Sequence, residues 1–245
     1  MKRIVLKVIR WVLLLFFGSS ILAVVALRFV PVYFTPLMFI RCVEQVKAGE
    51  KMTLKHKWVP IESISEHLPV AVMASEDQRF LLHHGFDVDA IKKAAERNKK
   101  GGKTYGASTI TQQTAKNVFL WPGRSWMRKG FEAYFTLLIE LLWSKQRIME
   151  VYLNSIEMGD GIYGAYSVAK HHFNKKPDEL TRAECAMIAV TLPNPRTMNS
   201  AEPSRYMLSR QRKIMQQMKF IPSFPKEGED IDPSTVTGGI YKTKK

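Results

Sequence analysis

The hydrophobic pattern of the chain begins with an uncharged apolar run over residues 11–27. This run is at the short end of the roughly 17–25 residues that a helix needs to cross a bilayer. Several cations precede the run and Arg28 alone closes it, which orients the N-terminal end toward the cytoplasm. No convincing small-x-small site follows, so an uncleaved anchor is favoured, with a cleaved signal peptide as the alternative.

The next segment, residues 29–40, stays apolar but is interrupted by Pro31 and Pro36. These prolines disfavour a second straight membrane span. Aromatic sequence of this kind beside an anchor suits the bilayer interface, and packing into the folded domain explains it equally well. We expect residues 41–58, which are polar, to form a connection.

Beyond the connection, the spacing of apolar residues predicts a series of helices and few strands, so the expected fold is mainly α. Pro69 in a first turn and Gly85 past the end delimit a helix over residues 70–83. The other predicted helices cover residues 90–100, a segment capped by Ser108 or Thr109, and residues 124–143, 145–154, 165–172, 180–191 and 205–220, before a loose tail.

Composition limits the possible classes of protein. The chain has 245 residues, of which 46% are hydrophobic and 24% charged, which excludes general disorder and leaves room for one good-sized core or two small ones. A net charge of +15 calls for an anionic partner: nucleic acid, a membrane surface or a phosphate-bearing substrate. Cys42 and Cys185 are far apart in sequence, and we expect two unpaired thiols.

The segment ASEDQRFLLHHGFD carries the first candidate chemistry. On the predicted helix, Glu76, Phe80 and His83 share one face. A carboxylate, an aromatic ring and an imidazole on one stripe are costly to bury, which suggests a functional site. A surface acid followed by a helix-ending histidine explains the segment about as well.

The second candidate segment is NKKGGKTYGASTITQQTAKN, a basic glycine-rich loop leading into a helix. The free N–H groups of a helix N-terminus favour anions. Thr109 and Gln112 fit a capping box, which is a structural role. Capping does not explain Gln113, Lys116 and Asn117, whose hydrogen-bonding groups suit a sugar or a diphosphate.

The third candidate segment, GRSWMRKGFE, places Arg128 and Glu132 one turn apart on a helix. As an ordinary surface ion pair they would contribute about 0.3–0.5 kcal/mol. With the preceding segment, these residues form a cationic cluster suited to a diphosphate: Lys116, Arg124, Arg128 and Lys129.

These segments resemble the ordered motifs of the peptidoglycan glycosyltransferases of family 51, the polymerase domain of class A penicillin-binding proteins and its monofunctional relatives. EDQRFLLHHG (residues 76–85) is similar to E-D-x-x-F-x-x-H-x-G, GASTITQQTAKN (106–117) to the second motif, and RKGFE (128–132) to R-K-x-x-E. KQRIMEVYLN (145–154) and GDGIYGAYSVAKHHFNK (159–175) follow in the family order, and LPNPRTMNSAEP (192–203) is similar to the end of the monofunctional form. The small departures at Thr136, Met149 and Asn174 concern packing and turn preference.

The resemblance implies a mainly α, lysozyme-like, two-lobed domain that transfers a growing glycan from a polyprenyl diphosphate onto the 4-hydroxyl of lipid II, with inversion. It implies that Glu76 is the general base and that Glu132 organises cations, or a divalent ion, beside the leaving group. The remaining residues would bind or shape the site: Asp77, Phe80 and His83 around Glu76; Lys116, Arg124, Arg128 and Lys129 at the diphosphate; and Ser108, Thr109, Gln112, Gln113 and Asn117 at sugar or phosphate.

The resemblance also implies a setting in cell wall biogenesis. We expect no organic cofactor and no protein-bound metal, with Mg²⁺ or Mn²⁺ near the diphosphate left open. Expected partners are lipid II, polyprenyl-linked glycan, membrane lipids, transpeptidases and other cell-wall machinery, but no nucleic acid. The expected organisation is a cytoplasmic basic tail (1–10), a single-pass anchor in the bacterial inner membrane (11–30), a glycosyltransferase domain on the periplasmic side (31–220) and a flexible tail (221–245).

Other functions are weaker interpretations. A lysozyme-like hydrolase also pairs carboxylates across a sugar bond, but it does not need the cationic cluster. A second, acylating activity would need more than the match of residues 167–170 to S-x-x-K, since no S-D-N or K-T-G follows. A non-catalytic membrane scaffold would not need Glu76 and Glu132. A nucleic-acid binder is the weakest, because the domain is expected outside the cytoplasm.

Overall fold

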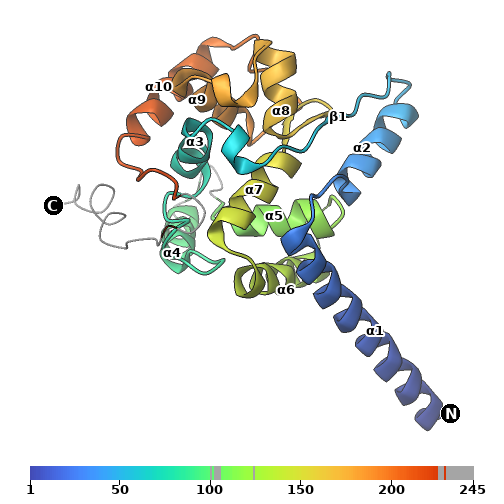
Figure 1. The fold of residues 1–245 in the computed structure, drawn as a ribbon. Helices are drawn as coiled ribbons and strands as arrows, with labels where there is room; N and C mark the ends of the chain where they lie inside the picture. Colours follow the sequence, from blue (N-terminus) through green and yellow to red (C-terminus); the bar gives the residue numbers. More distant parts are fainter. Residues whose placement is uncertain (100, 102–105, 124, 226–228, 230–245) are drawn as a thin grey trace.

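The computed structural model describes residues 1–99, 101, 106–123, 125–225 and 229. A long N-terminal helix, α1 (Lys2–Phe29), extends from a body of shorter helices, with the N-terminus at its far end (Figure 1). The fold is mainly helical, as predicted. The elements that follow α1 are α2 (Pro36–Lys47), β1 (Lys55–His56), η1 (Ile61–Ser63), α3 (His67–Glu76), α4 (Val88–Lys99), α5 (Ile110–Phe119), α6 (Trp126–Leu142), α7 (Lys145–Ser155), β2 (Glu157–Gly159), β3 (Ile162–Tyr163), α8 (Gly164–Val168), η2 (Ala169–Phe173), η3 (Pro177–Glu179), α9 (Arg182–Thr191) and α10 (Arg205–Gln217).

Helix α1 is long and apolar enough to cross a membrane, and most of it is exposed. Its C-terminal part is joined to the body through α6 and the residue that follows α6. The hydroxyls of Ser20 and Tyr134 are 2.7 Å apart, and the indole Nε1 of Trp143 donates to the carbonyl of Val24 at 2.8 Å. The body is therefore held close to the end of the apolar helix.

The prediction of a polar connection over residues 41–58 is wrong for its first part, because α2 runs from Pro36 to Lys47. Pro36 occupies the first turn of α2, where a missing N–H removes no helical hydrogen bond. The hydroxyl of Thr35 caps the helix by accepting from the backbone of Met38 at 3.3 Å. The proline therefore begins a helix here rather than merely interrupting one.

The apolar segment 29–40 packs partly into the folded domain, as one of the two interpretations predicts, and its place at the bilayer interface stays a prediction. Val32 and Met38 are buried in the body, whereas Phe34 and Phe39 are exposed. The segment thus packs along one side and presents aromatic rings on the other.

The helix predicted over residues 70–83 ends early, at Glu76. Asp77 leaves the helical conformation (φ −157°), and the chain passes through turns to Gly85. The carboxylate of Asp77 is held by His83 and by the backbone of Ile110, and these tertiary bonds replace the next helical turn. Glu76, Phe80 and His83 therefore do not share a helix face, which corrects the sequence interpretation.

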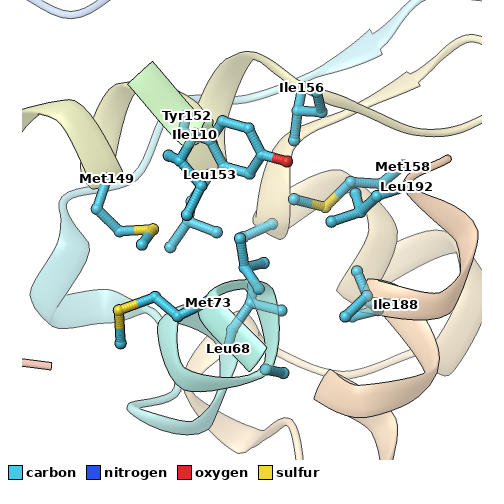
Figure 2. Packing of buried hydrophobic residues seen from close by; sticks show 14 of the residues in the cluster. Leu68, Met73, Ile110, Met149, Tyr152, Leu153, Ile156, Met158, Ile188 and Leu192 are labelled. Atoms are coloured by element: carbon cyan, nitrogen blue, oxygen red, sulfur yellow. The ribbon is translucent and has the colours of Figure 1, made fainter. Parts of the chain in front are cut away.

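Local capping signals locate the helices of the core. Thr109 and Gln112 form the predicted capping box at the start of α5, and Ser144 caps α7. Packing joins α5 to α6 and α7, and joins α3 to α9 and α10. Figure 2 shows the resulting apolar cluster, in which Met73 of α3 and Leu153 of α7 are fully buried.

The three short strands form a small sheet in the order β1-β3-β2. Strand β1 pairs in parallel with β3, and β2 pairs with β3 antiparallel. Cys42 and Cys185 are free thiols, as predicted.

The segment predicted as a flexible tail begins within the body. Ile221 is buried, and the ring of Phe224 stacks on that of Phe80 with 6.5 Å between centroids. Residues 226–228 and 230–245 of that segment lie outside the described residues.

Candidate active site

Glu76, the last residue of α3, lies between two clefts. The basic cleft has a volume of about 690 Å³, and its polar wall consists of Glu76, Ser108, Gln113, Lys116, Asn117 and Arg128. The α4 cleft, of about 520 Å³, shares Glu76 and Ser108 and is lined on its other side by Arg79, Asp87, Lys93 and Arg97. A single carboxylate thus faces two binding spaces.

The carboxylate of Glu76 accepts two side-chain hydrogen bonds. Ser75 Oγ donates to Oε1 at 3.0 Å, and Gln113 Nε2 donates to Oε2 at 3.2 Å. Burial raises the pKa of Glu76 above its ordinary value, while these hydrogen bonds and the charge of Arg210 oppose the rise. A carboxylate with a raised pKa that opens onto a cleft is suited to accept a proton from a ligand.

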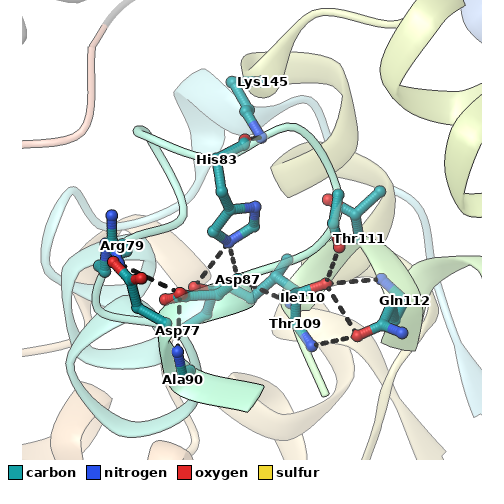
Figure 3. Close-up of polar contacts among 12 residues, drawn as sticks. Asp77, Arg79, His83, Asp87, Ala90, Thr109, Ile110, Thr111, Gln112 and Lys145 are labelled. Carbon is teal, nitrogen blue, oxygen red and sulfur yellow. Dashed lines mark hydrogen bonds and ion pairs between the residues drawn. The ribbon is translucent and has the colours of Figure 1, made fainter. Parts of the chain in front are cut away.

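Asp77, the residue after Glu76, belongs to a network of polar contacts (Figure 3). Asp77 accepts from Nε2 of His83, with both carboxylate oxygens at 2.9 Å, and from the backbone N–H of Ile110 at 3.0 Å. Phe80 is fully buried, and Nζ of Lys145 lies 4.5 Å from the centre of its ring. Asp77 contributes to the α4 cleft, whereas His83 and Phe80 support the turn from within.

Some residues of the second predicted motif hold the fold together, and others line the basic cleft. Thr109 donates to the carbonyl of Gly85 at 2.6 Å, which ties α5 to the turn after α3. Gln112 is buried and donates from Nε2 to Glu132 Oε1 at 3.2 Å. Gln113, Lys116 and Asn117, which capping does not explain, all line the basic cleft.

Two cations of the predicted cluster, Lys116 and Arg128, line the basic cleft. Lys116 donates from Nζ to Ser108 Oγ at 3.0 Å. Burial lowers the pKa of Lys116, as do the charges of Lys129 and Arg128, and Glu132 opposes the change. Arg124, which the sequence assigns to the same cluster, lies outside the described residues.

Glu132 is buried and is paired differently from the sequence expectation. Its Oε1 accepts from Lys129 Nζ at 2.5 Å, so the i,i+3 lysine forms the ion pair. Arg128 instead donates from Nε to the carbonyl of Trp121 at 2.6 Å, which turns it toward the basic cleft. The carboxylate of Glu132 therefore holds Lys129 and Gln112 rather than Arg128.

Two kinds of residue near the site were missed by the sequence analysis. Tyr152 donates to Oε1 of Gln113 at 3.1 Å; it lies in the KQRIMEVYLN segment, which predicts a helix and resembles a family motif but indicates no role for this tyrosine. The basic cleft also has an apolar wall, which no local pattern indicated because its members come from separate elements: Leu37, Leu120, Trp121, Pro122, Ile156, Leu192 and Pro193.

A carboxylate between two clefts, one of them lined by cations and apolar side chains, defines a candidate group-transfer enzyme for an anionic, partly apolar substrate. The transglycosylase family model matches residues 44–219 of the chain. The chain therefore belongs to the transglycosylase family, and the resemblance drawn from its motifs is confirmed.

Similar proteins extend along most of the chain. This chain is 59% identical over 221 residues to the biosynthetic peptidoglycan transglycosylase of Bacteroides thetaiotaomicron. The alignment covers 90% of this chain and 89% of that protein. Proteins of the same name from Bdellovibrio bacteriovorus and Stutzerimonas stutzeri are each 49% identical. Those alignments cover 90% and 87% of this chain and 88% and 86% of the respective relatives.

Proposed function

We propose that this protein is a peptidoglycan glycosyltransferase that polymerises glycan chains from lipid II. The family membership and the names of its relatives support this function. The observation that carries the mechanism is the position of Glu76 between the two clefts. In this mechanism the donor's diphosphate occupies the basic cleft and the acceptor sugar occupies the α4 cleft.

Glu76 acts as the general base. Its carboxylate takes the proton of the acceptor's 4-hydroxyl while that oxygen attacks the anomeric carbon of the donor. The new glycosidic bond forms on the face opposite the bond to the diphosphate, which breaks, so the configuration inverts. The donated hydrogen bonds of Ser75 and Gln113 orient the carboxylate for this transfer.

The cations stabilise the leaving group. Lys116 and Arg128 face the basic cleft and would offset the negative charge that grows on the departing diphosphate. Glu132 acts as a positioning residue, because one oxygen of its buried carboxylate, Oε1, accepts from both Lys129 and Gln112. Ser108 and Asn117 supply further hydrogen-bonding groups in the basic cleft.

The residues around Glu132 do not fit a protein-held divalent cation. Its Oε1 already accepts from two N–H donors, and the described part of the chain offers no group of three candidate ligands. We therefore derive no step through a metal ion. Polymerisation compared in EDTA and in added Mg²⁺ or Mn²⁺ tests the remaining possibility, a cation held mainly by the diphosphate of the substrate.

The substrate's long lipid requires a site at a membrane surface, and we propose that α1 crosses the cytoplasmic membrane with the body on its outer side. The docking of α1 on α6 supports a body seated on the membrane. Exposed apolar residues also lie just before α2, on α2 and on α6: Phe34, Phe39, Trp126, Met127, Leu137 and Leu141. Protease added to intact spheroplasts should then cleave the body, and protection until lysis would refute the orientation.

The product would be an uncrosslinked glycan, so we propose that transpeptidases act on it. Crosslinking joins stem peptides and none of the residues assigned above performs such a step. Co-purification of this chain with a transpeptidase after in-cell crosslinking would support a direct partnership, and recovery of neither protein with the other would argue against it.

The function is tested with full-length protein in detergent and fluorescent lipid II, resolved on a gel. The wild type is expected to make a ladder of glycans, and Glu76→Gln none. Glu62→Gln, an exposed carboxylate on η1, is the matched control and should behave as wild type. A wild type that shortens preformed glycan without making a ladder would identify a hydrolase. Inactivity of folded wild type on both substrates would favour a scaffold.

A further inference from the structure

Tyr152 of α7 is connected to Glu76 through a single side chain. The tyrosine hydroxyl donates to Oε1 of Gln113 at 3.1 Å, and Nε2 of the same amide donates to Oε2 of Glu76 at 3.2 Å. The three residues come from α7, α5 and α3, which meet at this point. We propose that Tyr152 is a positioning residue that fixes the Gln113 amide and, through it, the carboxylate of Glu76. This inference rests on the proposed function, in which Glu76 is the base.

The phenol ring is firmly held. Tyr152 is 0% exposed and packs in the apolar cluster beside Ile110 and Leu153 (Figure 2). A buried ring in a close-packed core has few alternative orientations, so the direction of its hydroxyl is set by the fold. The hydroxyl is therefore a fixed donor to which the amide of Gln113 can align.

The amide has two unlike ends, and only one of them suits Glu76. The NH₂ group can donate to the carboxylate, whereas the carbonyl oxygen would repel it. Burial raises the pKa of Tyr152 well above its ordinary value, so the hydroxyl keeps its proton and remains able to donate. Because this hydroxyl donates to Oε1, the Nε2 end of Gln113 is directed toward Glu76.

Other charged groups also affect the titration of Glu76. Their effect can be separated from that of the hydrogen-bonded relay from Tyr152 through Gln113 to Glu76. These charged groups are Asp77, which follows Glu76 in the chain, Lys116 of α5 and Arg210 of α10. Removing the tyrosine hydroxyl leaves all three in place. A change in the titration of Glu76 after that removal would therefore report the orientation of the amide.

Loss of the hydroxyl should weaken the base at low pH. Without its donor, Oε1 of Gln113 is free to turn toward Glu76, and a carbonyl facing the carboxylate favours the protonated acid. In Tyr152→Phe, the acid limb of kcat/KM for lipid II is expected to move up by about one pH unit, the size of one hydrogen bond to a charged group. Activity should approach the wild-type value at higher pH, where Glu76 is ionised again.

The matched control is Tyr163→Phe. Tyr163 is also 0% exposed, and its hydroxyl donates to the buried carboxylate of Glu157 at 3.4 Å, away from Glu76. It therefore reports the effect of deleting a buried tyrosine hydroxyl as such. Its pH profile is expected to match wild type, and an equal shift in both variants would overturn the proposal.

A double-mutant cycle tests whether the effect passes through Gln113. In a Gln113→Met background the amide is gone, so adding Tyr152→Phe should shift the acid limb no further. A full shift in that background would overturn the relay. Should Tyr152→Phe fail to fold, 3,5-difluorotyrosine at position 152 keeps the shape and strengthens the donor. It should move the acid limb down, and an unchanged limb would count against the proposal.

A readout independent of turnover separates this inference from the proposed function. The Glu76 carboxyl is followed by NMR titration of ¹³C-glutamate-labelled full-length protein, with Glu76→Gln identifying its signal. The relay predicts a higher titration midpoint in Tyr152→Phe than in wild type. If Glu76→Gln still polymerised lipid II, the proposed role of Glu76 would fail, while the NMR shift would still decide the relay.

Discussion

The carboxylate of Asp77 accepts a hydrogen bond from the backbone N–H of Ile110 at 3.0 Å. This bond joins the residue after α3 to the first residue of α5, whose N–H has no partner within its own helix. The same carboxylate accepts from His83. Asp77 thereby fixes the end of α3, which carries Glu76, against the helix that carries Gln113 and Lys116.

Replacing Asp77 should therefore loosen the whole site. Asp77→Ala leaves a buried N–H and a buried imidazole without their acceptor and is expected to lower the free energy of unfolding by about 2–4 kcal/mol. Denaturant unfolding of the detergent-solubilised protein measures the loss. Asp178→Ala, at an exposed position in η3, should change stability by less than about 0.5 kcal/mol. Equal losses in the two variants would contradict the role given to Asp77.

Gly85 closes the turn after α3 in a conformation that suits glycine (φ +85°). A Cβ atom there would come within 2.7 Å of Thr136 Cγ2 and 3.0 Å of Glu140 Cγ. Gly85→Ala should destabilise the protein through both the backbone conformation and the clash, by about 2 kcal/mol or more. Gly49→Ala separates the two effects, since its φ is +71° and no atom of the described residues lies within 4 Å of the added Cβ. The thermal unfolding temperature should fall less in this variant than in Gly85→Ala. Equal falls in the two variants would contradict the role given to the clash at Gly85.

Burial of Glu76 makes activity and stability depend on pH in opposite directions: activity needs the ionised carboxylate, whereas the folded state favours the protonated acid. Because the base must be ionised and its pKa is raised, the acid limb of kcat/KM should lie above about 4.3, the ordinary glutamate value. The raised pKa also means that the folded state favours the protonated acid, so stability is lost as pH rises through that pKa. Glu76→Gln cannot ionise and should be more stable than wild type near pH 7, with a smaller difference near pH 4. Thermal unfolding across this range measures both, and a constant difference would refute the argument.

Lys116 should set the basic limb of the pH profile. Burial lowers its pKa, so its charge is lost at a lower pH than that of an ordinary lysine. Lys116→Met is expected to reduce kcat by about 10²–10³, whereas Lys213→Met, exposed on α10, should have little effect. Lys116→Arg keeps a permanent charge and should move the basic limb to higher pH at a reduced kcat. A basic limb that stays in place in Lys116→Arg would assign it to another group.

Several features were predictable because they depend on neighbours in sequence. The starts of α5, α7 and α9 follow from Thr109, Ser144 and Thr181, whose hydroxyls accept from the first helical turn in each case. The early end of α3 was not predictable, since it depends on the bond from Asp77 to a residue of α5. The pairing of Glu132 with Lys129 likewise depends on the carbonyl of Trp121, which engages Arg128.

The sequence by itself determined the apolar N-terminal helix, the capped helices and the motif segments that identify the family, because these follow from composition, periodicity and short-range hydrogen bonds. Only the tertiary structure decided that Glu76 lies between two clefts, that Glu132 is buried behind the cations, and that Tyr152 reaches the base through Gln113. These relationships join different helices, and their geometry depends on how the helices pack rather than on the residues of any one of them.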